Sequence, residues 1–155
     1  MCETMQLQVD SDSRNISFVR AVVAAFFSRL DPTVEELEDV KTAVSEAVTN
    51  AIIHGYGNGP GVVEIKCTII GKETSTMIQD WGVGIADVKK AMEPLYTGRP
   101  DLERSGMGFS FMEAFMDTVC VESTPGRGTK VILGKIFPDV AEGWKQAAAS
   151  AGERV

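Results

Sequence analysis

The spacing of apolar side chains divides the first third of the chain into one strand and two helices. Residues 5–10, MQLQVD, alternate apolar and polar side chains, which is typical of a strand with one buried face. Apolar residues then recur every three or four positions over about residues 14–29, and again in a longer second helix. Ser13 is expected to cap the first helix, and Thr33 with Glu36 predicts a capping box for the second.

The rest of the chain is rich in predicted strands that are joined by short turns. These strands cover residues 62–70, 74–80, 118–124 and 128–137. Between the two strand pairs we expect a short helix over residues 86–92, a loop over residues 93–106, and a helix that opens at GMGF. Strands joined by short turns pair antiparallel, and the helices collect in two groups. The order therefore predicts an α+β fold with helices packed on one face of the sheet.

Composition and charge narrow the class of protein. The 155 residues are 44% hydrophobic and 24% charged, as expected for one folded domain. No apolar run is long enough to span a membrane, and the N-terminus lacks the pattern of a secretory signal. The net charge of −7, with no basic patch, argues against direct nucleic-acid binding and favours a basic protein partner. Cys2, Cys67 and Cys120 are odd in number, which is typical of free thiols in a reducing cytosol.

The second predicted helix carries two polar residues away from its apolar stripe. Glu46 and Asn50 lie one turn apart and are neighbours on the same face. Asn50 can supply an oxygen to Mg²⁺, which proteins commonly hold with few side chains plus nucleotide phosphates. Glu46, facing the same cavity, can orient or deprotonate an attacking hydroxyl. The alternative is an ordinary solvated pair on the outer face of a helix.

Glycines follow an acid at the end of a predicted strand. Asp80 precedes Gly82 and Gly84. A carboxylate at this place can accept a hydrogen bond from an exocyclic amine, and glycines let the backbone approach a flat ring closely. The same residues are also typical of a turn that begins with Asp.

A second pair of glycines opens a predicted helix. Free backbone N–H groups near Gly106 and Gly108 can bind phosphate oxygens, and Arg104, just before them, can add a bidentate donor. A glycine-capped helix with a solvated arginine is the alternative.

Thr129 enters the last strand after PGRG, which by itself indicates a hairpin. His54, the single histidine, is expected to be structural or to cap a helix end.

The order of these motifs resembles the four boxes of the GHKL ATPase superfamily. The stretches VSEAVTNAIIHGY, DWGVGI, RPDLERSGMGF and STPGRGT are more closely similar to the sporulation anti-sigma F factors, over roughly residues 5–137. The resemblance implies a two-layer α/β sandwich of the Bergerat type, with a mixed, mainly antiparallel sheet and helices on one face. It implies a kinase domain over residues 1–137 and gives no role to the tail, residues 138–155.

The resemblance also assigns roles to individual residues and implies ATP and Mg²⁺ as cofactors. Asn50 would bind Mg²⁺, and Glu46 would be the catalytic base. Asp80 would contact the adenine amino group, with Gly82 and Gly84 beside the ring, and Thr129 would support adenine binding. Arg104, Gly106 and Gly108 would close over the phosphates, and Arg20 would contact partner proteins. The loop over residues 93–105 would be a lid that nucleotide orders.

The implied function is that of a cytoplasmic, dimeric, ATP-dependent serine kinase. It would hold sigma factor F inactive and phosphorylate an anti-anti-sigma protein that displaces the sigma factor. Two alternatives remain open at this stage. ATP could serve only as a conformational ligand of a binding module, or the kinase could act in another partner-switching pathway such as a stress response. Glu46 favours the kinase, because a binding module needs the metal ligand Asn50 but no base.

Overall fold

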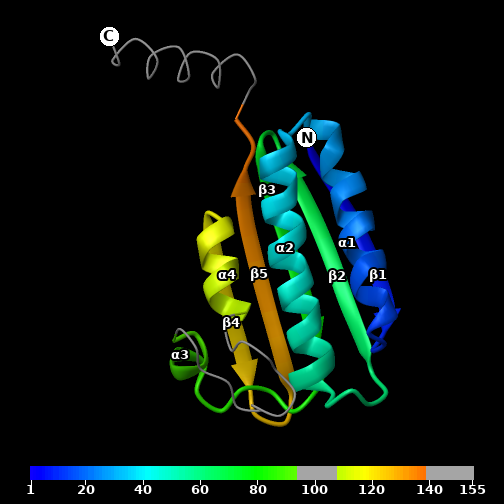
Figure 1. The fold of residues 1–155 in the computed structure, drawn as a ribbon, viewed down its shortest axis with the longest axis vertical. Helices are drawn as coiled ribbons and strands as arrows, with labels where there is room; N and C mark the ends of the chain where they lie inside the picture. Colours follow the sequence, from blue (N-terminus) through cyan, green and yellow to red (C-terminus); the bar gives the residue numbers. More distant parts are fainter. Residues whose placement is uncertain (94–107, 139–155) are drawn as a thin grey trace.

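The computed structural model describes residues 1–93 and 108–138, which form one sheet covered by helices (Figure 1). In chain order the elements are β1 (Cys2–Asp10), α1 (Arg14–Phe27), a 3₁₀ turn (Ser28–Leu30), α2 (Val34–Asn50), a π-helical turn (Ala51–Gly55), β2 (Val62–Ile70), β3 (Glu73–Asp80), α3 (Val88–Ala91), α4 (Gly108–Phe115), β4 (Thr118–Thr124) and β5 (Gly128–Ile136). The elements predicted from periodicity are therefore confirmed. The predicted lid beyond Glu93 and the tail beyond Pro138 lie outside the described residues.

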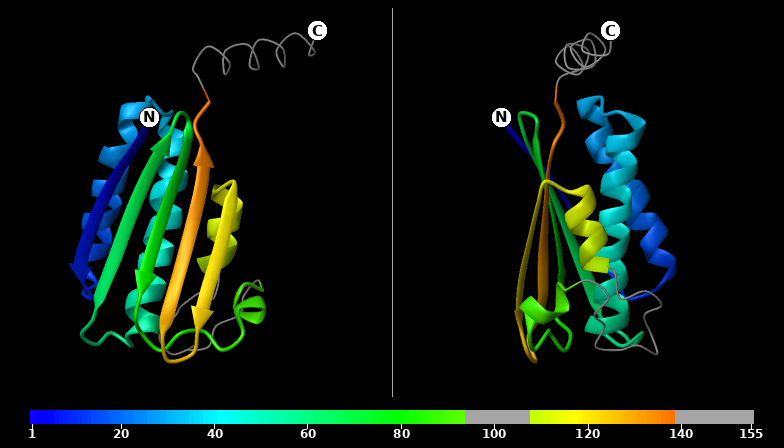
Figure 2. Two further views of the ribbon diagram at one scale, coloured as in Figure 1. Left: turned by 180° about the vertical axis from the view of Figure 1, so that it is seen from behind. Right: turned by 60° about the vertical axis from the view of Figure 1, so that its left-hand side comes forward.

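The five strands form one sheet in the order β1-β2-β3-β5-β4. All of the pairings between these strands are antiparallel, and no parallel pair occurs among the described residues. The last strand, β5, lies between β3 and β4, which joins the two predicted hairpins into one sheet. Helices α1, α2 and α4 cover a single face of it (Figure 2). This arrangement confirms the predicted α+β sandwich with helices on one face.

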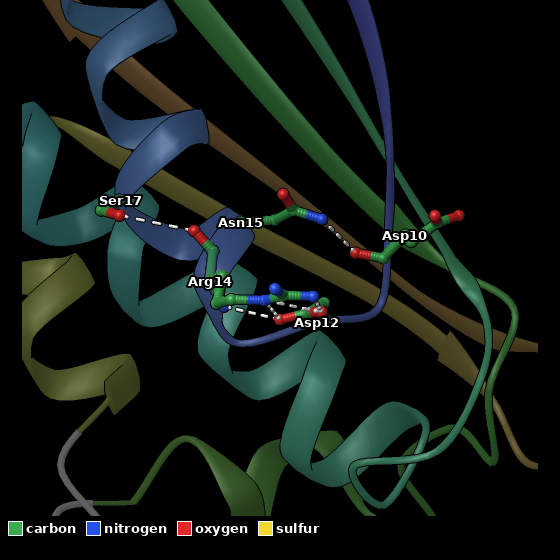
Figure 3. Close-up of polar contacts among 5 residues, drawn as sticks. All are labelled: Asp10, Asp12, Arg14, Asn15 and Ser17. Carbon is green, nitrogen blue, oxygen red and sulfur yellow. Dashed lines mark hydrogen bonds and ion pairs between the residues drawn. The ribbon is translucent and has the colours of Figure 1, made fainter.

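The start of α1 differs from the expectation. Ser13 already has helical backbone angles, and its side chain makes no capping hydrogen bond. Instead, the Asp12 carboxylate accepts hydrogen bonds from the Arg14 backbone N–H at 2.9 Å and from Arg14 Nε at 3.1 Å (Figure 3). The hydrogen-bonded Arg14 side chain lowers the pKa of Asp12 to about 2. The Asn15 amide donates to the Asp10 carbonyl oxygen at 2.9 Å and ties the helix start to β1. The predicted Ser13 cap is wrong because the cap lies one residue earlier.

The start of α2 is as predicted. The Glu36 backbone N–H donates to Thr33 Oγ1 at 3.1 Å, and the Thr33 N–H donates to Glu36 Oε2 at 2.8 Å, which completes the capping box. The apolar stripe of this helix is buried in the core with the inward side chains of β2 and β5. Its buried residues are Val40, Ala43, Val44, Ala47 and Val48. The helix is thereby fixed against the sheet and packs beside α4, which covers the same sheet face (Figure 2).

Two further features of the described residues are their helix lengths, which bear on membrane spans, and their three cysteines, which bear on disulfides. None of the helices among the described residues is long and apolar enough to cross a membrane. All three cysteines are free; Cys2 and Cys120 are exposed, whereas Cys67 is buried. Burial raises the pKa of the Cys67 thiol to about 11, so that this thiol stays protonated at neutral pH.

Candidate functional site

Four segments meet at one end of the sheet, where α2 and β3 end, α4 begins and β4 turns into β5 (Figures 1 and 2). The described residues to which the resemblance assigns a role in binding the nucleotide or the metal, or in catalysis, lie on these segments or on the loop that follows β3. Residues far apart in the chain are thus gathered at one place. Arg104 and Gly106 lie outside the described residues.

Asp80 is the last residue of β3 and is only 4% exposed. Burial raises the pKa of its carboxyl group, and hydrogen bonds from the backbone N–H groups of Gly82 and Thr129 partly offset this effect. The Gly82 N–H lies 2.9 Å from Asp80 Oδ1. Buried carboxylates are rare in cores, and one with a raised pKa in a cluster of loops indicates a functional site.

The glycines beside Asp80 allow main chain to pack on main chain. A Cβ atom on Gly82 would lie 1.9 Å from the Gly55 carbonyl oxygen, so that no side chain fits there. Gly84 has a φ of +75°, and its Cβ would lie 2.3 Å from the Thr124 carbonyl oxygen. These contacts explain both glycines without a ligand. Their predicted place beside a flat ring stays a prediction.

Hydrogen bonds hold the loop after Asp80 in one position. The Val83 N–H donates to the Gly55 carbonyl oxygen at 2.9 Å, and the Val83 carbonyl oxygen accepts from the Gly126 N–H at 2.7 Å. The Tyr56 hydroxyl accepts from the Trp81 N–H at 2.8 Å and donates to the Val62 carbonyl oxygen at 2.5 Å. The loop therefore links the end of α2 to the β4–β5 turn, and Asp80 sits on a rigid support.

Glu46 and Asn50 face the start of α4. A Cβ atom on Gly108 would lie 3.2 Å from Asn50 Nδ2, 3.3 Å from Asn50 Oδ1 and 3.3 Å from Glu46 Oε2. Both polar side chains are half-buried. The predicted neighbourhood of the acid and the amide on one helix face is therefore confirmed. A Cβ atom at the first position of α4 would crowd both side chains, so that a glycine there gives them the most room.

Arg20 lies apart from this site, on α1. Its guanidinium Nη2 atom is 3.4 Å from Glu38 Oε2 of α2, and its side chain is 39% exposed. Glu38 also accepts a hydrogen bond from Lys41 Nζ at 2.7 Å, which is the main cause of the lowered pKa of Glu38. The contact to Arg20 is the longer one, so Glu38 holds Arg20 only loosely.

Two residues of the site were not assigned from the sequence. Tyr56 stands in the stretch IIHGYG, but no pattern there indicated that its hydroxyl joins two strand ends. Ser123 lies directly opposite Thr129 in the β4–β5 pair, and its Oγ atom is 2.8 Å from Thr129 Oγ1. The hairpin register around PGRG could have suggested this pair. No local pattern indicated that Ser123 lies near Asp80, because this depends on the strand order, in which β5 lies between β3 and β4.

Comparison with known proteins identifies the class to which this fold and site belong. Residues 9–135 match the family model of the histidine kinase-like ATPase domain. A crystal structure of the RsbU and RsbW domains of a Mycobacterium tuberculosis protein has the same fold, with a TM-score of 0.62 and 18% sequence identity. That match covers 87% of this chain and 32% of the other. The chain is therefore a histidine kinase-like ATPase domain of the GHKL type.

Sequence relatives define the family more narrowly. The chain is 60% identical over 132 residues to the anti-sigma F factor of Clostridium novyi, covering 84% of this chain and 92% of the relative. It is 59% identical over 133 residues to the anti-sigma F factor of Clostridium acetobutylicum, covering 86% and 93%. The anti-sigma F factor of a Thermoanaerobacter species is 56% identical over 131 residues, with coverage of 84% and 92%. The chain belongs to the anti-sigma F factor family.

Proposed function

We propose that this protein is an ATP-dependent serine kinase that inhibits the sporulation sigma factor F. In this proposal it also phosphorylates an anti-anti-sigma protein, which without the phosphate displaces the sigma factor. The observation that carries the kinase activity is that Glu46 and Asn50 of α2 both face Gly108 at the start of α4, where a Cβ atom would lie 3.2–3.3 Å from their polar atoms. The family membership supports the sigma partner. Because a sigma factor acts in the cytoplasm, we propose the same location for this protein.

The base of ATP is proposed to lie beside Asp80. The ionised carboxylate can accept a hydrogen bond from the adenine amino group. Thr129 lies directly opposite Asp80 on β5, with its side chain on the same sheet face. The rigid loop around Gly82 and Gly84 would border the base. A buried acceptor held by two backbone N–H groups keeps its position without ligand, which reduces the cost of ordering the site on binding.

The metal and phosphates are proposed to lie between α2 and α4. Among the described residues, no group of three or more His, Cys, Asp and Glu side chains could hold a metal ion. The Asn50 amide fits Mg²⁺, because this ion prefers oxygen ligands and is commonly held by few side chains together with phosphates. The start of α4 at Gly108 offers backbone N–H groups for phosphate oxygens. Bound Mg²⁺-ATP supplies the phosphoryl group, and Arg104 and Gly106 are proposed to complete the site.

Glu46 is proposed to accept the proton of the target serine. A serine hydroxyl is a poor nucleophile until a nearby base takes its proton. The Glu46 carboxylate faces Gly108 together with the proposed metal ligand, where the reacting groups are proposed to lie. In this proposal Asn50 orients the phosphates through the metal ion, and Glu46 accepts the proton of the serine hydroxyl.

Replacement of Asn50 by Ala is expected to weaken Mg²⁺-dependent ATP binding by roughly 10- to 100-fold, the loss typical of a disturbed metal site. The Asn50→Asp variant keeps an oxygen ligand and serves as the matched control, with a smaller loss expected. Calorimetric titration with ATP, in the presence and absence of Mg²⁺, measures the effect. Unchanged affinity in Asn50→Ala would contradict the metal assignment.

The partner surface is proposed to include Arg20. Charge reversal in Arg20→Glu would place two carboxylates together, since Glu38 is the present partner of Arg20. We expect this variant to bind sigma factor F and the anti-anti-sigma protein about 30-fold more weakly or worse, as for a residue that dominates an interface. ATP affinity should not change, because Arg20 lies outside the nucleotide site.

Binding of both partners by wild-type protein and Arg20→Glu, measured with Mg²⁺-ATP present, tests the anti-sigma function. The Arg14→Glu variant is the matched control, because Arg14 is a more exposed arginine on the same helix. Wild-type protein that binds neither partner would overturn the proposed function. Equal affinities for wild type and Arg20→Glu would overturn only the role of Arg20.

A homodimer is part of the proposal. The sheet face opposite the helices is not covered by any helix among the described residues (Figure 2). Met77 of β3 lies opposite Ile132 of β5 on this face, and Ile70 and Ile136 near its end are 56% and 53% exposed. Apolar side chains on an open sheet face favour a second copy as the covering partner.

A further inference from the structure

Ser123 belongs to a row of polar side chains that crosses three strands. Asp80 of β3 lies directly opposite Thr129 of β5, and Thr129 lies directly opposite Ser123 of β4. Side chains of directly opposed residues lie on the same sheet face, about 5 Å apart at Cβ. Ser123 therefore stands behind Thr129 as seen from Asp80.

The Ser123 hydroxyl has three hydrogen-bonding neighbours. Its Oγ atom lies 2.7 Å from the Ile85 backbone nitrogen, 2.9 Å from the Gly128 carbonyl oxygen and 2.8 Å from Thr129 Oγ1. A serine hydroxyl has one proton to donate and two lone pairs to accept with. Three contacts therefore use its full capacity.

Only one set of hydrogen-bond directions satisfies all three contacts. The Ile85 N–H can only donate, so Ser123 accepts from it. The Gly128 carbonyl oxygen can only accept, so Ser123 donates its single proton there. The remaining contact must then be donated by the Thr129 hydroxyl. Thr129 has no other hydroxyl proton, and its Oγ1 atom presents only lone pairs to other groups.

We propose that Ser123 is a positioning residue that fixes the Thr129 hydroxyl as an acceptor and so makes the site select 6-amino over 6-oxo purine nucleotides. The inference rests on the proposed nucleotide binding beside Asp80. The ionised Asp80 carboxylate and the oriented Thr129 oxygen are then two acceptors side by side. An amino group at position 6 of a purine can donate to such a pair, whereas a 6-oxo oxygen faces acceptors alone and stays unpaired.

Removal of the Ser123 hydroxyl frees the Thr129 proton. In Ser123→Ala the Thr129 hydroxyl can rotate and donate to the oxygen at position 6 of inosine triphosphate (ITP). We expect the preference for ATP over ITP, the ratio of the two dissociation constants, to fall about tenfold, the effect of one ordinary hydrogen bond. The Ser123→Thr variant keeps a hydroxyl at this place and should keep the wild-type preference.

The double variant Ser123→Ala/Thr129→Val distinguishes the orientation of the Thr129 hydroxyl by Ser123 from the support that Ser123 gives to the loop at Ile85. Ser123 also holds the Ile85 N–H, so its loss can disturb the loop and weaken both nucleotides together. Such a disturbance leaves the ratio unchanged. If the freed Thr129 proton causes the change, adding Thr129→Val to Ser123→Ala should remove the gain in ITP affinity. The Ser123→Cys variant fills the same space with a weakly bonding thiol and provides the same comparison if Ser123→Ala does not fold.

Titration of each purified variant with Mg²⁺-ATP and Mg²⁺-ITP, together with thermal unfolding as a check of folding, tests the inference. A lower preference for ATP in Ser123→Ala or Ser123→Cys, restored in Ser123→Thr, is the expected result. A wild-type preference in Ser123→Ala, or an equal loss for both nucleotides, would overturn the role of Ser123 while leaving the proposed function intact. Wild-type protein that binds neither nucleotide would overturn both.

Discussion

Replacement of Glu46 by Gln is expected to slow phosphoryl transfer to the anti-anti-sigma protein by about two orders of magnitude or more. The glutamine keeps the shape of the side chain beside Gly108 but cannot take the serine proton. Affinity for Mg²⁺-ATP and for the sigma factor should stay at the wild-type level. Single-turnover transfer of labelled phosphate measures the rate, and calorimetry measures the two affinities.

The matched control is Glu35→Gln, an exposed glutamate in the first turn of the same helix. It should transfer phosphate at the wild-type rate. Near wild-type transfer by Glu46→Gln would show that Glu46 is only a polar residue on a helix face. Loss of ATP binding in that variant would instead assign Glu46 to the metal or the nucleotide.

Replacement of Asp80 by Asn is expected to weaken ATP binding by roughly 10- to 100-fold or more, since a charged acceptor with two oxygens becomes a neutral amide with one acceptor oxygen, for which the Gly82 and Thr129 N–H groups compete. The same change should stabilise the protein without nucleotide at neutral pH. Burial is the largest cause of the raised pKa of Asp80, so the folded state disfavours the ionised carboxylate. Asparagine has no charge to bury. Function and stability should therefore change in opposite directions.

The pH dependence follows from the direction of the Asp80 shift. The folded state raises this pKa, so protonation of the Asp80 carboxyl stabilises the folded state relative to the unfolded chain. This contribution is complete below the pKa of the unfolded state and is lost as the pH rises through the pKa of the folded state. The stability gained by Asp80→Asn should thus be largest at neutral pH and shrink on acidification. Thermal unfolding at several pH values measures it. The exposed Asp87, which caps α3, provides the control Asp87→Asn. A less stable Asp80→Asn protein at pH 7 would contradict this expectation.

Local patterns predicted most of the fold. Helix α2 followed from its apolar spacing and from Thr33 with Glu36, because a capping box involves only residues of one helical turn. Ser13 shows the limit of this reasoning. Asp12 and Ser13 can both cap a helix, and the choice between them depends on backbone angles that the residue types alone do not determine.

The site was only partly predictable from the sequence. The common orientation of Glu46 and Asn50 follows from helix geometry, so the sequence was sufficient for that pair. The row of Asp80, Thr129 and Ser123 depends on strand order, because β5 lies between β3 and β4. Pairing between strands that are distant in the chain leaves no local pattern. The same is true of Gly82, whose close neighbour Gly55 belongs to another element.

Transfer of the terminal phosphate of ATP to a serine of the partner is the direct test of the proposed kinase activity. Purified protein is incubated with Mg²⁺, ATP labelled on the γ-phosphate and a purified anti-anti-sigma protein from an organism with an anti-sigma F factor. We expect labelled phosphoserine on the partner with wild-type protein and about a hundredfold less with Glu46→Gln. Tight ATP binding without any labelled partner would contradict it, and would indicate a binding module for which ATP is only a conformational ligand.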